Sequence, residues 1–294
     1  MATVAETQAV VQRRERRESL GAYLARRAPQ MVVIFVFTVS IVLPIVYMAT
    51  TSLKEPIEIR ESGALLPSKG LFTINWVRAY RNVPLHMYLF NSTVVAVCST
   101  LLAMAIAVPA TYAIVRFRAG GQMLPSMILG TYVMPPIVVS IPFFAMMRLL
   151  SLVNTKTGLI VAHAMIHAPV AIWLLDSFVR AIPKELEEAA WIDGYSRFQT
   201  LFRVVLPLIQ PGLVATAVIC LILSWNEFLF ALLLTYSDVS HTFPVGVSRY
   251  EGEHGLQFGE MSAAALTGIV PIYILVLFFQ QYLVRGLTRG GVKG

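Results

Sequence analysis

The sequence predicts an all-α membrane protein with six transmembrane helices. Of its 294 residues, 57% are hydrophobic and only 13% are charged, whereas soluble domains carry about 25% charged residues. The mean hydropathy of the chain is +0.70. This leaves too little charge to cover a surface that faces water, so lipid must be the main solvent. Six apolar stretches also reach the length of about 20 residues that a helix needs to cross a bilayer.

The expected spans are residues 31–50, 89–115, 123–149, 158–179, 207–236 and 261–283. The first apolar stretch is too long for a signal peptide, and no small-residue cleavage site follows it. Proline lies within or beside every span. Transmembrane helices tolerate such breaks when neighbouring groups satisfy the freed backbone carbonyls.

The distribution of basic residues predicts the orientation. If the N-terminus lies in the cytoplasm, fifteen of the 23 lysines and arginines fall on the cytoplasmic side, and five of the others lie in the loop 51–88. Both termini are therefore expected to be cytoplasmic. We divide the chain into a cytoplasmic basic arm, residues 1–28, and a transmembrane domain, residues 29–294. No basic face with interleaved aromatic residues is present, which argues against nucleic-acid binding.

The segment 183–206, between the fourth and fifth spans, is expected to form two short helices. Pro183 suits the first position of a helix, and acidic residues such as Glu187 in the opening turns oppose the positive end of the helix dipole. Gly194 suits the left-handed position that ends a helix. Ser196 and Gln199 then form a capping box for the second helix.

Each of these helices has a distinctive face. On the first helix, Leu186, Ala189, Ala190 and Asp193 share a face that is small in its middle, so another surface can approach it closely. The second helix carries an apolar stripe made of Phe198, Leu201, Phe202 and Val205. These patterns alone leave open an interfacial hairpin that has no partner.

The same segment resembles the EAA motif of ABC importer permeases. The matching residues are Glu188-Ala189-Ala190, then Gly194, then Val204-Val205-Leu206-Pro207, with Val204 where the family often has isoleucine. In that family the motif forms the coupling helix, which docks on a cytoplasmic ATPase. The resemblance implies the type I permease fold, with this helix between helices 4 and 5. It also assigns ATPase coupling to Glu188, Ala189, Ala190, Asp193, Gly194, Leu206 and Pro207.

Two further motifs resemble the maltose-type carbohydrate permeases, specifically the MalG-like subunit. They are Trp225-Asn226-Glu227-Phe228 and the end of the chain from Gly286 to Gly294. The resemblance implies a second homologous permease, two ATPase subunits and an extracytoplasmic solute-binding protein as partners, in a bacterial plasma membrane. It implies import of a carbohydrate or carbohydrate-like solute by alternating access, with sugars, oligosaccharides, glycerol-phosphate esters and polyols all compatible.

The chain has no Gly-x-x-x-x-Gly-Lys-Ser/Thr phosphate loop, so we expect a transporter subunit and not an enzyme. ATP and magnesium would be bound by the partner ATPase, and no cofactor is expected here. The alternatives are a secondary, ion-coupled transporter or another multi-span membrane protein. No internal repeat is visible that would favour a secondary transporter.

Polar residues inside the spans are further candidates. Trp225, Asn226 and Glu227 lie in the fifth span, where a charge costs about 2.5–3.5 kcal/mol. They could line the solute pathway, or Glu227 could form a structural hydrogen bond between helices. His163 and His167 share a helix face, but no third ligand is near in sequence, so we expect a hydrogen-bonding patch and no metal site.

Three expectations concern the ends of the spans. Asp176 and Arg180, one turn apart, should form a local ion pair. Asn91 is expected to cap the second span. The loop from Ser237 to Glu260 lies on the outer face, where it either contacts a solute-binding protein, as the resemblance implies, or is simply solvated.

Overall fold

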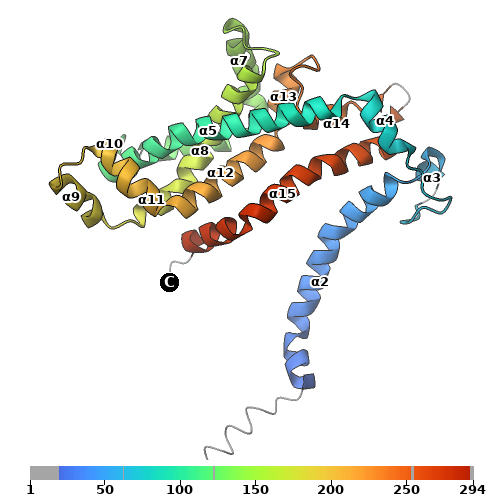
Figure 1. The fold of residues 1–294 in the computed structure, drawn as a ribbon, viewed down its shortest axis with the longest axis horizontal. Coiled ribbons are helices and arrows are strands. Elements are labelled where there is room, and N and C mark those ends of the chain that lie inside the picture. The colour runs from blue at the N-terminus through green and yellow to red at the C-terminus, as the bar shows by residue number, and fades with distance from the viewer. Residues whose placement is uncertain (1–19, 62, 122, 253–254, 292–294) are drawn as a thin grey trace, which may run out of the picture.

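Helices α5 (Leu85–Phe117) and α8 (Lys156–Arg180) lie side by side and form the core together with α12 (Gln210–Trp225), as Figure 1 shows. The structure is a computed structural model that describes residues 20–61, 63–121, 123–252 and 255–291. Small buried residues, Ala107, Ala171 and Cys220, lie where the three helices meet. Small side chains let helix backbones approach closely, which is how helices associate in membranes.

Helix α15 (Phe258–Gly291) packs along α12 and also contacts α2 (Leu20–Thr51) and α4 (Ile74–Asn82). In Figure 1, most of α2 projects away from the other helices. In its described part, none of the most apolar 18-residue window is buried. Its side chains must therefore be covered by lipid or by another chain. Part of the expected arm 1–28 is helical, because α2 begins at Leu20, and residues 1–19 lie outside the described residues.

The part of the chain that the structure describes contains four continuous helices long and apolar enough to span a membrane. Two bent pairs bring the number to six if each pair is one span. Helices α6 (Met123–Val133) and α7 (Pro136–Leu149) meet at 96°. Pro135 lies in this break and Pro136 begins α7; proline lacks the N–H that would continue the preceding helix.

The second bend, of 83°, separates the segment that ends with α11 (Leu206–Leu208) from α12. The expected fifth span, 207–236, is broken again after Trp225, before the short helix α13 (Leu229–Leu234). The spans 123–149 and 207–236 are therefore not straight helices. Gly212 allows the tight packing after the bend, since a Cβ atom there would lie 2.4 Å from the Phe178 ring.

The connecting segments gather at opposite ends of the molecule. Helices α9 (Lys184–Ile192) and α10 (Arg197–Thr200), followed by the π-helical turn η1 (Leu201–Val205), form one end. Helices α3 (Pro56–Glu61), α4 and α14 (Phe243–Ser248) lie toward the other end (Figure 1). The two-residue strands β1 (Glu251–Gly252) and β2 (Gly255–Leu256) pair antiparallel, with Glu251 opposite Leu256.

Candidate functional site

Helix α9 ends in the turn that its sequence predicts. Gly194 has φ +88°, in the left-handed region, and its N–H donates to the Trp191 carbonyl at 3.1 Å. The N–H of Tyr195 donates to the Ala190 carbonyl at 3.0 Å, which satisfies another of the last carbonyls of the helix. The guanidinium of Arg197 lies 3.4 Å from the centre of the Trp191 ring and holds the turn closed from one side.

The capping box at the next helix is confirmed. The Gln199 N–H donates to the Ser196 hydroxyl at 3.3 Å, and the Ser196 N–H donates to the Gln199 side-chain oxygen at 2.8 Å. The expected apolar stripe is divided, however. Leu201 and Val205 are buried against the bundle, whereas Phe198 and Phe202 are exposed. The reason is the π-helical turn η1, whose i→i+5 hydrogen bonds put more residues in each turn than an α-helix has and so shift the apolar positions around the axis.

A buried carboxylate fixes α9 to the bundle. Glu187 is only 1% exposed, and it accepts hydrogen bonds from the Tyr112 hydroxyl at 2.8 Å and from Nε of Arg116 at 2.5 Å. Arg116 also donates to the carbonyls of Val179 and Ile182, both at 2.8 Å. This cluster joins α9 to the end of α5 and to the end of α8.

From the sequence alone, Glu187 is only one of several acidic residues in the opening turns of α9. The available signal was the pair Tyr112 and Arg116, one turn apart near the end of an apolar span, because buried donors of this kind need an acceptor. Its neighbour Glu188 is exposed.

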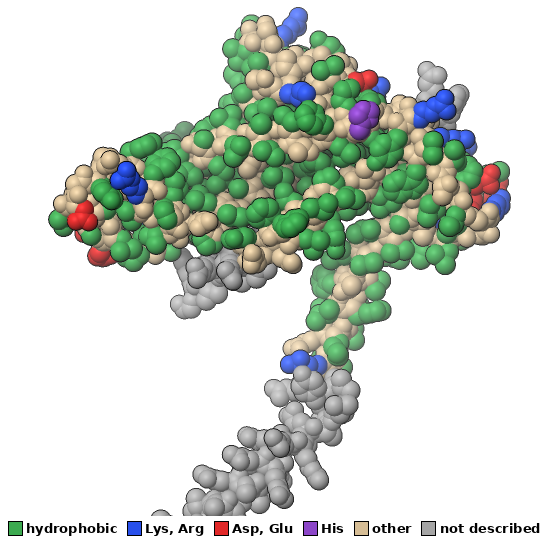
Figure 2. All heavy atoms as spheres, in the orientation of Figure 1, with side chains coloured by type: hydrophobic (Ala, Val, Ile, Leu, Met, Phe, Trp, Pro, Cys, Tyr) green, Lys and Arg blue, Asp and Glu red, His purple; other side chains and the backbone are tan. Residues whose placement is uncertain are grey.

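The motif residues of α9 point mainly away from the bundle. Ala190 is buried, whereas Ala189, Asp193 and Gly194 are exposed, as is Glu188. The apolar side chains of α9 are exposed as well: Leu186 at 45% and Ile192 at 87%. At this end of the molecule, on the left of Figure 2, hydrophobic side chains lie among charged ones. Of the two remaining coupling candidates, Leu206 is half-buried and Pro207 is exposed.

The break between α12 and α13 is held by Glu227. Its carboxylate accepts hydrogen bonds from the N–H groups of Phe230 at 3.0 Å and Ala231 at 3.1 Å, and thereby caps α13. It also lies 3.2 Å from Nε2 of His163 on α8. The other ring nitrogen of His163 lies 2.7 Å from the Ser224 hydroxyl, which lies 2.9 Å from the Ser99 hydroxyl on α5. A chain of polar groups thus links the three core helices. It includes the contact between helices that was one of the two roles considered for Glu227.

His167 lies one turn along α8 from His163, with 6.0 Å between the ring centres, and it is also buried. Among the residues that the structure describes, no group of three or more His, Cys, Asp or Glu side chains is arranged to hold a metal ion.

Trp225 and Asn226 lie beside a cleft of about 500 Å³ between α12, α14 and α15. Trp225 stacks on Phe243 with ring centres 6.4 Å apart, and Asn226 donates to the Ile222 carbonyl at 2.8 Å. Tyr273 and Pro244 line the same cleft. The cleft therefore combines aromatic faces with one amide, as sites for small polar molecules commonly do.

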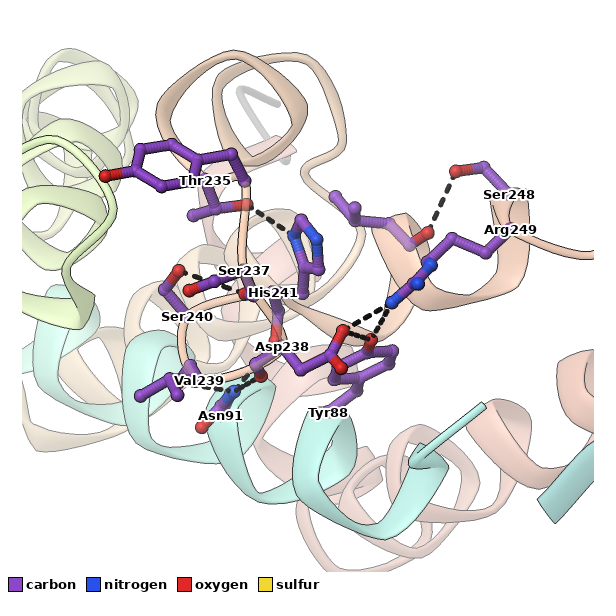
Figure 3. Close-up of polar contacts among 12 residues, drawn as sticks. Tyr88, Asn91, Thr235, Ser237, Asp238, Val239, Ser240, His241, Ser248 and Arg249 are labelled. Atoms are coloured by element: carbon purple, nitrogen blue, oxygen red, sulfur yellow. Dashed lines mark hydrogen bonds and ion pairs between the residues drawn. The ribbon is translucent and has the colours of Figure 1, made fainter. Parts of the chain in front are cut away.

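At the opposite end, the loop after α13 is held in place by two asparagines. Oδ1 of Asn154 accepts hydrogen bonds from the N–H groups of Tyr236 and Ser237, each at 3.1 Å, and from the Ser240 hydroxyl at 2.5 Å. Nδ2 of Asn91 donates to three backbone carbonyls, those of Asp238, Val239 and His241 (Figure 3). The expectation that Asn91 caps a helix is wrong, because α5 begins six residues earlier, at Leu85.

An ion pair that shares a tyrosine of α5 also holds this loop. Asp238 accepts hydrogen bonds from the Tyr88 hydroxyl at 2.6 Å and from Arg249, and the Tyr88 hydroxyl also lies 2.5 Å from Arg249 (Figure 3). The hydrogen bond from Tyr88, together with that from Arg249, holds the pKa of Asp238 below its usual range. Nearby, Nδ1 of His241 lies 2.8 Å from the Thr235 hydroxyl, and burial lowers the pKa of His241.

Part of the expected loop Ser237–Glu260 is thus ordered structure. It contains α14, β1 and β2, and Glu260 belongs to α15, where it accepts a hydrogen bond from Asn82 at 2.9 Å. The ion pair expected between Asp176 and Arg180 is confirmed: two hydrogen bonds of 2.7 and 2.9 Å join the side chains.

Comparison with known proteins places this arrangement in a family. The family described as "Binding-protein-dependent transport system inner membrane component" matches residues 99–289. The chain is 35% identical to the sulfoquinovosyl glycerol transport system permease protein SmoH of Agrobacterium fabrum, over 94% of this chain and 97% of that protein. It is 38% identical to the trehalose/maltose transport system permease protein MalG of Thermococcus litoralis, over 75% of this chain and 81% of that protein.

A solved structure shares the fold. A chain of a bacterial ABC transporter involved in the import of the acidic polysaccharide alginate superposes with a TM-score of 0.74 and 21% identity, covering 90% of this chain and 98% of that one. The predicted family and the predicted all-helical permease fold are thus confirmed. The chain belongs to the binding-protein-dependent inner-membrane transport components and is a multi-pass permease subunit of an ABC importer.

Proposed function

We propose that this permease imports a carbohydrate or carbohydrate-like solute, and that an ATPase docked on α9 drives it by alternating access. The relatives named above are transport proteins for sulfoquinovosyl glycerol and for trehalose or maltose, and a third, 34% identical, is the trehalose transport system permease protein SugB of Mycobacterium tuberculosis. A carbohydrate is the chemistry that these names share.

One observation supports the coupling role: α9 is attached to the bundle on one side and exposes an apolar face on the other. Glu187 ties the helix to α5, while Leu186 and Ile192 are exposed and Ala189 between them is small. An exposed apolar patch rimmed by charge marks a surface that another protein covers. We assign this surface to the ATPase, with Glu188, Asp193 and Gly194 on it and with Leu206 and Pro207 joining it to α12.

The complete transporter would contain a second homologous permease, two ATPase subunits and an extracytoplasmic solute-binding protein. A related solved structure is that of an alginate ABC transporter in complex with an alginate pentasaccharide-bound periplasmic protein. We assign the loop Tyr236–Arg249, at the end opposite α9, to contact with the binding protein. We propose that both termini and α9 lie in the cytoplasm, and that the chain divides into the arm 1–28 and the permease domain 29–294.

For the solute pathway we propose different roles for neighbouring residues. Trp225 and Asn226 face the cleft between α12 and α15, where an indole and an amide suit the apolar faces and hydroxyl groups of a sugar. Glu227 borders the pathway, but its role is structural. Its carboxylate holds the break between α12 and α13 by accepting from N–H groups of α13 and by contacting His163.

The test is reconstitution of the permease with its co-purified ATPase and its binding protein in proteoliposomes. We expect solute uptake only with ATP, and ATP hydrolysis that rises when the binding protein is loaded with the sugar. Asn226→Ala should raise the sugar concentration needed for half-maximal uptake while the complex stays intact. Glu227→Ala should instead lower the thermal stability of the permease.

Uptake driven by an ion gradient without ATP, or purification without any ATPase chain, would contradict the proposed coupling. Full ATP-driven transport of a solute other than a carbohydrate, with none of a sugar panel accepted, would overturn only the proposed substrate.

A further inference from the structure

The ends of α5 and α8 near α9 enclose a basic cleft of about 830 Å³, to which the proposed transport cycle assigns no role. Arg116, Arg118, Arg180 and Lys184 line it, together with Gly121 before α6 and Pro125 in the first turn of α6. The two arginines at the helix ends, Arg116 and Arg180, already have carboxylate partners, Glu187 and Asp176. Arg118 and Lys184 have no such partner among the residues that the structure describes.

This cleft continues into an apolar groove. A second cavity, of about 230 Å³, shares Ile114, Pro125 and Arg180 with the first and runs between α6 and α8 along Leu129 and Trp173. Trp173 is 60% exposed. Among the described residues that line the two cavities, Asp176 is the single carboxylate, and Arg180 neutralises it.

The position of the pair of cavities along the helices fits a membrane surface. Apolar spans end at the headgroup region of a bilayer, and α5 ends at Phe117 and α8 at Arg180. The basic cleft therefore lies at headgroup depth, and the apolar groove reaches from it toward the hydrocarbon. Basic pockets between transmembrane helices at this depth suit anionic headgroups.

We propose that the cleft binds the phosphate headgroup of an anionic phospholipid, with Arg118 and Lys184 as the charged contacts and one acyl chain in the groove beside Trp173. The ligand is an amphiphile because the charged cleft and the apolar groove form one continuous surface. A zwitterionic phospholipid would occupy the groove less favourably, because its ammonium group would lie close to two unpaired cations.

The proposal can be tested through the fluorescence of Trp173 in the assembled transporter, reconstituted in bilayers that contain a small fixed fraction of lipid with brominated acyl chains. The chain has four tryptophans, so the difference between the wild type and Trp173→Phe isolates the relevant signal. We expect brominated phosphatidylglycerol to quench this signal more than phosphatidylcholine with the same brominated chains.

The double variant Arg118→Gln/Lys184→Gln should lose this preference, which corresponds to about a thirtyfold decrease in relative affinity for two basic contacts. The matched control is Arg148→Gln/Arg203→Gln, which removes the same charge outside the cleft and should keep the preference. Raising the ionic strength should also weaken the preference of the wild type, which gives a test that needs no substitution in the cleft.

Three outcomes would overturn the proposal. Equal quenching by both lipids in the wild type would mean that the groove takes any acyl chain and the basic residues select nothing. Absence of a Trp173-dependent signal would mean that protein covers the groove. Loss of the preference on addition of millimolar inorganic phosphate would mean that the cleft binds the soluble ion and not a lipid.

Discussion

At Gly194, the backbone conformation required by the turn excludes most side chains. Its φ of +88° lies in the left-handed region, yet no atom lies within 4 Å of the position that a Cβ would take. A side chain there would meet open space, so the cost of a substitution is backbone strain alone, about 1–2 kcal/mol.

We expect Gly194→Val to insert normally in the membrane but to transport poorly, because the strain reshapes the exposed end of α9. The measurement is ATP-driven uptake in proteoliposomes, beside the amount of ATPase that co-purifies. Gly70→Val is the matched control, since Gly70 also has positive φ, +96°, and open space around it, but lies in the loop before α4. Wild-type transport by Gly194→Val would remove α9 from the coupling role.

Single residues were predictable where the rule is local. Gly194, Ser196 and Gln199 follow from the preferences of helix ends within a few positions, and all three have the predicted geometry. Glu187 was not predictable in this way, because its partners Tyr112 and Arg116 lie more than 70 residues earlier on another helix. Nothing in its immediate neighbours distinguishes it from Glu188.

Two adjacent carboxylates of the element α9 point in opposite directions: Glu187 into the bundle and Glu188 toward the exposed surface. We expect Glu187→Ala to destabilise the permease itself by about 3–5 kcal/mol, because Arg116 keeps a buried charge that has lost its partner. Glu188→Ala should leave the stability unchanged and reduce ATPase binding, since Glu188 is exposed.

Thermal unfolding of the purified permease, followed by affinity measurements with the ATPase, separates the two effects. Similar losses of stability in both variants would show that α9 is not anchored through Glu187.

The loop Tyr236–Arg249 should respond to pH through His241 and Asp238. Burial lowers the pKa of His241 from 6.5, so the unfolded loop takes up a proton at a higher pH than the folded loop does. The stabilisation is therefore complete above pH 6.5 and is lost as the pH falls below that value. The lowered pKa of Asp238 adds a second loss in the same direction at more acidic pH.

We expect amide hydrogen exchange in Tyr236–Arg249, corrected for intrinsic rates, to accelerate between about pH 7.5 and pH 5.5. His241→Asn should remove this change and keep the loss at lower pH, because the Asn amide does not titrate and can still hydrogen-bond to the Thr235 hydroxyl oxygen. An unchanged pH response in His241→Asn would exclude His241 as its source.

The breaks in the third and fifth spans show what hydropathy leaves undetermined. The prolines near them predicted irregular helices, but a proline such as Pro109 lies inside α5 without ending it, whereas α6 and α7 meet at 96° around Pro135 and Pro136. Hydropathy records only the length and composition of an apolar stretch, so it does not separate a continuous helix from a bent one.

For the whole molecule, the excess of basic residues near one set of span ends predicts that both termini are cytoplasmic. We expect a fluorescent protein that matures only in the cytoplasm to be bright when fused to either terminus, and alkaline phosphatase to be active only when inserted after Gly70. Active phosphatase at the C-terminus would show that the topology is inverted or that the number of spans differs from six. Helix α9 would then lie on the side of the membrane opposite to an ATPase.

Helix α5 has a consequence for the mechanics of the transporter. Tyr88 and Asn91, in its first two turns, hold the loop at one end of the molecule, and Tyr112 and Arg116, in its last two turns, hold Glu187 of α9 at the other. These 33 residues form one rod of roughly 50 Å. A tilt of the rod at one end therefore displaces the other in the opposite sense, as in a lever whose fulcrum is the tightly packed contact with α8. Binding of the solute-binding protein on one side of the bilayer and the nucleotide state of the ATPase on the other would then both depend on the tilt angle of α5.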